Sequence, residues 1–254
     1  MLSLQLTRAV TDGSRRVLTR TGGILFALLL AQQALVVTSL NTVLVAETAA
    51  TESIGLTLPV SETVAGAVFV GVSLFNAVYF VVLARAFARP LAQLSSFPAE
   101  LYTRRIVPAS LTMLVAGLSV AVATLVGFVA LFFPGVFLAA CFLFVIFAVG
   151  VEDCGVIRAL KRSWDLSRGH RLRLGVFVSV VGIGGALVGA VPAVLELAGE
   201  PAIGDVTTAL SNSILFIFVY GIMASAYRQV TDASDGLGGT GTSAAAGTGS
   251  VLES

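Results

Sequence analysis

Five long stretches of this chain carry no charged residue, and their lengths limit the fold more than any other feature. A helix needs about 20 apolar residues to cross the hydrocarbon core of a membrane, and all but one of the stretches match a single crossing. The stretch 106–151 is about twice that length, and Pro134-Gly135 near its middle is a turn signal. The sequence therefore predicts six transmembrane helices, from the uncharged stretches 21–46, 63–84, 106–151, 174–195 and 206–227.

Charge is separated between the loops that these crossings place on opposite sides. One side holds all 15 Lys and Arg residues, in segments 1–20, 85–105, 152–173 and 228–254. The other side carries acids only, namely Glu47, Glu52, Glu62, Glu196, Glu200 and Asp205. Short loops rich in Lys and Arg stay in the cytoplasm. We therefore expect a protein of the cytoplasmic membrane with both termini inside.

Composition excludes a soluble globular domain, because 57% of the residues are hydrophobic, 11% are charged and the mean hydropathy is +0.98. Six crossings use roughly 150 residues, which leaves no room for a separate catalytic domain. His170 is the single histidine of the chain. Zinc-ligand spacings, a nucleophile with a plausible His partner and a phosphate-binding loop are all missing. We expect a protein that is not an enzyme, with no catalytic residue, metal, cofactor or nucleic-acid partner.

The predicted fold is all-α, a six-helix transmembrane bundle with amphipathic helices at the cytoplasmic interface. Residues 1–20 mix Leu, Val and Arg, and are expected to form a short helix on the inner surface. Residues 229–254 are rich in Gly, Ser, Thr and Ala, and are expected to be disordered. The membrane domain between them, 21–228, is predicted to cross at about 22–46, 63–86, 108–133, 135–151, 174–195 and 206–227.

The basic segment 152–173 carries the most information. At about 100° per residue, one side of a helix here is apolar and the opposite side is mostly charged. This pattern is typical of a helix in the inner interface, with Trp164 at headgroup depth. Such clusters attract anionic lipid headgroups, so we predict contact with these lipids or with a membrane-protein partner. The alternative is a topology anchor that binds nothing specific. The candidate contact face consists of Arg158, Lys161, Arg162, Trp164 and Arg168.

A few polar side chains fall within the predicted crossings, namely Gln32, Gln33, Asn76 and Asn212. They either form interhelical hydrogen bonds or line a polar cavity for a small solute. The fifth crossing is rich in glycine. Gly185 and Gly189 have the spacing that lets a neighbouring helix approach closely, although a mobile cavity wall is the alternative.

Part of the basic segment resembles a known family. The motif Glu152-xx-Gly155-xxx-Ala159-Leu160-x-Arg162-Ser163-Trp164-x-Leu166-xx-Gly169 follows an apolar span that opens at Pro134-Gly135. This is similar to multi-span proteins related to the membrane domain of glycerophosphoryl diester phosphodiesterase, which have uncharacterised prokaryotic relatives. The likeness covers about residues 130–180. It implies a six-helix membrane bundle with an accessory role. It does not imply hydrolase activity, because the sequence contains no soluble phosphodiesterase domain.

These observations lead to two functional hypotheses. The first is a non-enzymatic membrane protein with an accessory, structural or binding role, which contacts lipid or a partner through the basic 152–173 face. The second is a transporter or exporter of a small or lipid-like solute. In the second case, we expect Gln32, Gln33 and Asn76 to line one cavity.

Overall fold

The computed structural model describes residues 5–48 and 55–243, and every regular element among them is helical. Six helical segments are long and apolar enough to cross a membrane, as the sequence predicts. The helices are α1 Leu6–Val17, α2 Arg20–Thr48, α3 Glu62–Ala88, η1 Leu91–Gln93, α4 Glu100–Thr103, α5 Ile106–Ala130, α6 Phe132–Cys141, α7 Val145–Gly150, α8 Val156–Ser167, α9 Arg171–Leu197 and α10 Pro201–Ser243.

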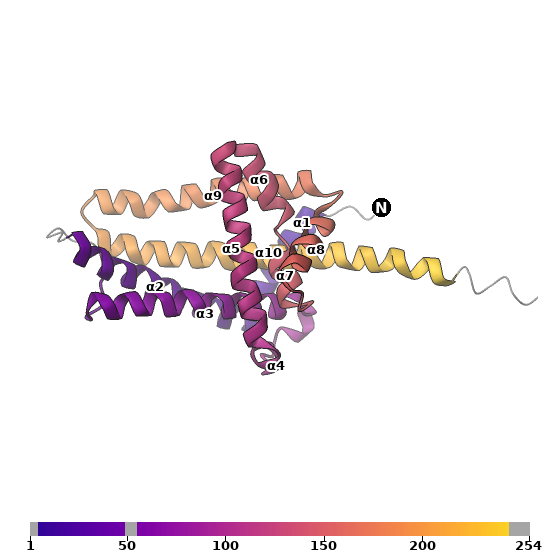
Figure 1. Cartoon of the computed structure of the whole chain (residues 1–254), viewed down its shortest axis with the longest axis horizontal. Helices are drawn as coiled ribbons and strands as arrows, with labels where there is room; N and C mark the ends of the chain where they lie inside the picture. The colour runs from indigo at the N-terminus through magenta and orange to yellow at the C-terminus, as the bar shows by residue number, and fades with distance from the viewer. Residues whose placement is uncertain (1–4, 49–54, 244–254) are drawn as a thin grey trace, which may run out of the picture.

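The long helices fall into two groups by direction. Helices α2, α3, α9 and α10 run side by side along the long axis of the molecule (Figure 1). Within this four-helix body, α10 packs against α2, α3 and α9. Helix α5 instead runs across the body, and α6 packs back against it (Figure 1). The number of apolar segments did not predict this crossing.

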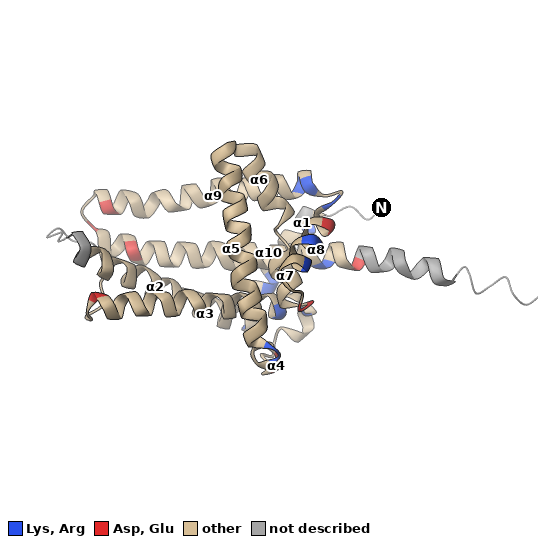
Figure 2. Ribbon diagram, in the orientation of Figure 1, with Lys and Arg blue, Asp and Glu red and all other residues tan. Residues whose placement is uncertain are grey.

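Charged residues gather at the two ends of the four-helix body. Lys and Arg lie at the end where α8 and the start of α9 are found (Figure 2). The loops at the opposite end contain acids and no base. We call these the basic end and the acidic end. The separation seen in the sequence is therefore a separation in space.

The hairpin of α5 and α6 turns earlier than the sequence predicts. Leu131 has an extended backbone and separates the two helices, whereas Pro134 and Gly135 lie inside the first turn and a half of α6. Proline is tolerated in a first helical turn, because the amide that it lacks has no partner there anyway. Gly135 lets the helices meet, since a Cβ there would overlap the ring of Phe128.

The core sits towards the basic end. The buried residues of α3 are concentrated from Ala77 to Phe87, its last part. Helix α5 buries Ala109, Met113 and Ala116 near its start, whereas Val129 near its end is 81% exposed. Long apolar surfaces therefore remain free of protein contact, as expected for helices that face lipid.

The predicted N-terminal helix is present as α1, and it lies against protein. It packs on α10, where a Cβ on Gly13 would overlap the backbone of Ile222. Arg16 is buried, and its Nη1 donates to the carbonyls of Phe87 and Arg89 at 2.6 Å each. Desolvation, and then the charge of Arg228, lower the pKa of Arg16 to about 10. Helix α1 thus holds the end of α3.

The last long helix continues beyond the predicted sixth crossing. Helix α10 continues to Ser243, and 244–254 lie outside the described residues. The extension starts against α1, where the side-chain oxygen of Gln229 accepts from the Gln5 amide at 3.1 Å. An existing helix propagates more easily than a new one starts, because each added residue gains one hydrogen bond.

The glycine pair of α9 does not form the predicted close contact. A Cβ on Gly189 would meet nothing within 4 Å, and one on Gly185 would make ordinary contact with Leu215 at 3.5 Å. Helix α9 buries little beyond Leu174 and Pro192, so its glycines face mostly open space. Close approach occurs elsewhere, for example where a Cβ on Gly150 would overlap Ala84.

Candidate functional site

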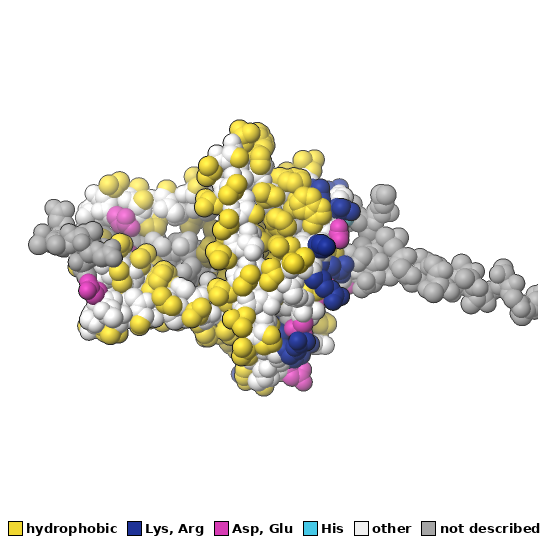
Figure 3. All heavy atoms as spheres, viewed as in Figure 1, with side chains coloured by type: hydrophobic (Ala, Val, Ile, Leu, Met, Phe, Trp, Pro, Cys, Tyr) yellow, Lys and Arg dark blue, Asp and Glu magenta, His cyan; other side chains and the backbone are white. Residues whose placement is uncertain are grey.

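A cavity of about 540 Å³ lies where α5 crosses the four-helix body. Its walls come from α3, α5, α6, α7, α9 and α10, and Figure 3 shows the surface hollowed beside α5, between α9 and α3. We call it the crossing cavity. Ligand pockets typically have about 300 to 1,000 Å³, mostly apolar walls and a few placed polar groups. Its polar lining residues are Ser73, Asn76, Thr124 and Tyr220.

Two of these polar groups have no partner. Asn76 Oδ1 and Thr124 Oγ1 are inaccessible and accept or donate no hydrogen bond within the described chain. Ser73 differs, because its hydroxyl donates to the carbonyl of Phe69 at 2.7 Å. Buried polar groups in native proteins are nearly always paired, and an unpaired one costs about 1–3 kcal/mol. Asn76 and Thr124 therefore bring two unpaired polar atoms to the wall of the cavity.

The sequence of α5 explains why the crossing leaves space. Met113, Gly117, Ala121 and Thr124 recur every three or four residues, so they share one face of the helix, and all of them line the cavity. Two of the four are small. A Cβ on Gly117 would meet nothing within 4 Å. Small side chains on a crossing helix leave a hollow instead of an interdigitated contact.

One wall of the cavity is a break between α6 and α7. The side chain of Ser163, on α8, forms hydrogen bonds to both sides of this break. Its hydroxyl donates to the Cys141 carbonyl at 2.8 Å and accepts from the Phe144 amide at 3.1 Å. Non-helical backbone at membrane depth must be satisfied by other protein groups. Ser163 does this for the break, and so fixes the position of Phe142, which lines the cavity.

Ion pairs fasten α8 beside the break. Arg162 Nε lies 3.0 and 3.1 Å from the two carboxylate oxygens of Glu152, and the Tyr227 hydroxyl donates to Glu152 Oε1 at 2.7 Å. Next to this pair, Asp153 bridges the buried Arg85 at 2.9 Å and Arg104 at 3.0 Å. Arg162 is therefore bound to its own chain and does not belong to an outward contact face.

Most residues of the motif that carries the family resemblance hold α8 against the rest of the protein. Gly155 precedes the first residue of α8, Ala159 and Leu166 are buried, and Gly169 adopts a φ of +80° that favours glycine. The predicted apolar side of α8 is covered in part, since Val156 and Leu160 pack against the core whereas Ile157 is 71% exposed. The covered side carries Ala159, Ser163, Leu166 and Ser167.

The outward face of α8 borders a second hollow. This groove of about 390 Å³ is more open than the cavity and lies at the basic end. Phe142 belongs to the lining of both hollows. We call it the basic groove, and its lining residues are Phe142, Leu160, Lys161, Trp164, Asp165 and Arg168. Three residues of the predicted contact face, Lys161, Trp164 and Arg168, lie here, whereas Arg158 is exposed outside it.

The polar residues predicted inside the membrane do not come together. Asn76 lines the crossing cavity, but Gln32, Gln33 and Asn212 do not. The crossing cavity therefore contains Asn76 without either glutamine, because α2 contributes nothing to its walls. Gln32 is buried on α2, and its Oε1 is unpaired. Sequence reasoning missed Thr124, although its helical spacing from Gly117 and Ala121 was a usable signal.

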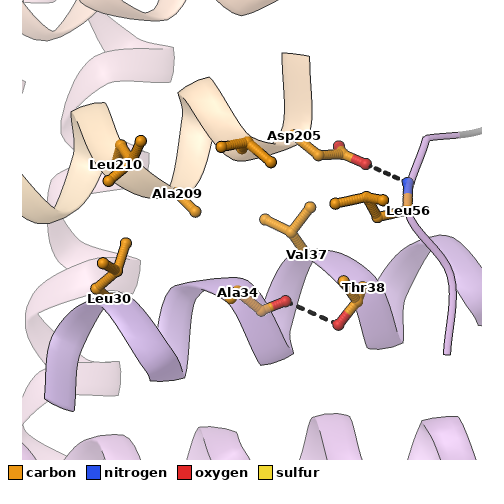
Figure 4. Close-up of a pocket in the computed structure, with 9 residues that line it drawn as sticks. Leu30, Ala34, Val37, Thr38, Leu56, Asp205, Ala209 and Leu210 are labelled. Atoms are coloured by element: carbon orange, nitrogen blue, oxygen red, sulfur yellow. Dashed lines mark hydrogen bonds between the residues drawn. The ribbon is translucent and has the colours of Figure 1, made fainter. Parts of the chain in front are cut away.

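A smaller pocket of about 190 Å³ lies between α2 and α10 near the acidic end (Figure 4). Its polar groups are paired. Asp205 Oδ2 accepts from the Leu56 amide at 2.6 Å and from Asn41 Nδ2 at 2.8 Å. The Thr38 hydroxyl donates to the Ala34 carbonyl at 2.8 Å. We call it the acidic-end pocket. It offers a ligand no unsatisfied group, so the crossing cavity is the stronger candidate.

Comparison with protein-family models gives one match. A family model described as a domain of unknown function, DUF7847, matches residues 4–230. The chain belongs to this family. The match includes every helix that shapes the cavity and the groove. Comparisons with curated proteins and with solved structures gave no match.

Proposed function

We propose that this protein is a non-enzymatic membrane protein that binds a membrane lipid and holds its hydrocarbon chain in the crossing cavity. The observation that carries the proposal is the lining of this hollow, in which 17 of the 21 residues are apolar. The hollow is reached from the surface beside α5 (Figure 3), which is itself apolar and exposed. A lipid chain fills such a space at little cost, because it leaves one apolar environment for another.

The proposal includes an orientation. The basic end lies on the cytoplasmic side of the cytoplasmic membrane, together with both termini, because loops rich in Lys and Arg are retained there. The apolar segments of α2, α3, α9 and α10 then cross the bilayer. A lipid of the inner leaflet has its headgroup at this end. The resemblance to the glycerophosphoryl diester phosphodiesterase membrane domain stays a prediction, as does a membrane-protein partner.

The test uses a phospholipid with a photoreactive diazirine in its acyl chain. Wild-type protein in nanodiscs that contain this lipid is irradiated, and cross-linked peptides are mapped by mass spectrometry. We expect cross-links to Phe216 and Tyr220, which line the cavity. Gly117→Leu should abolish them, because the new side chain extends into the hollow.

Gly189→Leu is the matched control. A Cβ there also meets nothing within 4 Å, but the residue does not line the cavity. Both variants place a leucine in a helix, so they share any effect of added bulk or helix propensity. Equal cross-linking of Phe216 and Tyr220 in wild type, Gly117→Leu and Gly189→Leu would contradict the proposal.

The broken helix favours a second candidate, a transporter of a lipid-like solute. Interrupted helices mark the binding sites of many transporters, and the α6–α7 break lies at the cavity wall. Transport requires that a lipid changes leaflet, whereas binding alone does not. A dithionite assay on fluorescent lipid in proteoliposomes separates the two. Accelerated exchange that Gly117→Leu abolishes would favour transport.

A further inference from the structure

The junction of α8 and α9 gathers basic side chains around one tryptophan. Trp164 packs against Phe137 and Phe142, with ring centroids 5.9 and 6.1 Å away. The Arg171 guanidinium carbon lies 4.3 Å from the Trp164 centroid and 5.3 Å from that of Phe137. An arginine above aromatic faces gains cation–π energy while its N–H edge stays available for a planar anion.

Arg171 has donors that nothing satisfies. Its Nε and Nη2 atoms are inaccessible and have no hydrogen-bond partner within the described residues. Nδ1 of the neighbouring His170 is in the same state. Arginine stays charged in proteins, and a buried donor on a charged group without a partner is costly. An anion close to Trp164 would remove this cost.

The basic groove has a net positive lining. Lys161 and Arg168 contribute two charges, and Asp165 is its one acid. Asp165 pairs with Arg168 at 3.6 Å, but both side chains are more than half exposed, so the pair is weak. Lys161 is exposed and makes no ion pair with any described acid. The groove therefore attracts anions.

We infer that the basic groove binds the phosphate of a phospholipid whose chains occupy the crossing cavity. This inference rests on the proposed function, and it adds the class of ligand: an anionic phosphodiester lipid. The occupant is a lipid and not a free anion, because the groove has an aromatic wall, Phe142, in common with the apolar cavity. Arg171 lies over the ring of Trp164 and positions this wall of the groove.

The test compares two lipids with identical chains, phosphatidylglycerol and diacylglycerol. Protein in neutral detergent is mixed with both, separated from excess lipid by gel filtration and analysed for retained lipid. Wild type should prefer phosphatidylglycerol roughly 25-fold, since each of two basic side chains near an anionic group contributes about fivefold. The double substitution Lys161→Gln with Arg168→Gln should remove the preference and leave diacylglycerol retention unchanged.

The control removes the same charge elsewhere. Arg15 and Arg158 are exposed and lie outside the groove, so Arg15→Gln with Arg158→Gln should keep the preference. If this control also loses the preference for phosphatidylglycerol, the preference depends on the net charge of the protein and not on the groove, which would overturn the inference. Displacement of phosphatidylglycerol by inorganic phosphate would assign the groove to a soluble anion, which also overturns it.

The two proposals fail in different ways. If Gly117→Leu prevents retention of both lipids but wild type shows no preference between them, the cavity proposal is supported and the headgroup site is contradicted. If Gly117→Leu blocks neither lipid, the cavity proposal fails whatever the preference is. Asp165→Asn adds a check on the sign of the headgroup charge. It should raise phosphatidylglycerol retention about fivefold by removing a repulsion. A fall in phosphatidylglycerol retention would overturn the anionic headgroup site.

Discussion

The crossing cavity and the acidic-end pocket differ in how their polar groups are treated. In the acidic-end pocket, Asp205 accepts from the Leu56 amide and from Asn41, and Thr38 bonds within its own helix. In the crossing cavity, Asn76 and Thr124 carry atoms with no partner. In the first, the chain itself supplies the hydrogen-bond partners of the polar groups. The second leaves two polar atoms unpaired within the described residues.

The difference follows from how the helices meet. Helices α2 and α10 lie side by side, so the loop after α2 can fold over their seam and place Leu56 against it (Figure 4). Helix α5 crosses the body at one region, and past that region its packing within the described residues comes from α6. Side-by-side packing lets neighbouring segments pair each other's polar groups, whereas a single crossing does not.

The largest expected effect concerns the wall between the cavity and the groove. Ser163→Ala leaves the Cys141 carbonyl and the Phe144 amide without their buried partner. We expect the free energy of unfolding to fall by about 3 kcal/mol, together with a loss of lipid retention. Ser119→Ala is the control, since that hydroxyl bonds only within α5 at an exposed site. Chemical denaturation measures the free energy of unfolding of both variants. Equal values for the two variants would contradict the role of Ser163 at the break.

A smaller effect is expected at the acidic-end pocket. Asp205→Ala removes the acceptor of the Leu56 amide and of Asn41. These contacts are partly solvated, so we expect a loss of about 2 kcal/mol in the free energy of unfolding. Lipid retention should not change. Glu200→Ala serves as the exposed acidic control. If Asp205→Ala releases lipid instead, the two hollows are coupled and the contrast between them fails.

A pair of isosteric changes tests the contrast directly. Thr124→Val deletes an unpaired hydroxyl and should raise the free energy of unfolding by about 1 kcal/mol without lowering lipid retention, because a hydrocarbon chain makes no hydrogen bond to that hydroxyl. Thr38→Val deletes a paired hydroxyl and should leave stability unchanged or slightly lower. Thermal unfolding with and without added lipid measures both. The same sign of change for the two variants would show that the hollows are equivalent.

The smallest effect concerns a thiol at the basic end. Cys154 is 4% exposed, and burial, followed by the charge of Glu152, raises the pKa of its thiol. The reactive thiolate is therefore scarcer at a given pH than on an exposed cysteine, and labelling by an impermeant maleimide should be slow at neutral pH and faster as pH rises. Arg158→Cys, in a chain without Cys154, provides an exposed reporter that should react from the cytoplasmic side only. Labelling of Arg158→Cys from outside intact cells would reverse the proposed orientation.

The sequence predicted what depends on composition along one helix. The six apolar segments and the helix at 156–167 follow from hydropathy and charge pattern, and both are present. The direction of α5 was not predictable in this way, because a helix that is apolar on all sides carries no information about which neighbour it meets. The hairpin turn at Leu131 also gave no signal beyond the nearby Pro134.

Contacts between distant residues explain the errors in the predicted site. Arg162 looked like a surface base, and only the fold shows that Glu152, ten positions earlier, binds it. Gln32 and Asn76 both looked like cavity residues, but they lie on helices with different neighbours. Ser163 is one of many serines in the sequence. Its role depends on a helix break that the local sequence does not announce.

Helix α5 has a mechanical consequence for the bilayer. With the four-helix body placed along the membrane normal, α5 lies along the membrane plane, nearer the basic end than the acidic end (Figure 2). Its 25 residues then extend roughly 37 Å within one monolayer. The protein occupies more area in that monolayer than in the other, which gives it the outline of a wedge. Many copies in one patch would expand that monolayer relative to the other and would make the membrane convex on the side of the basic end.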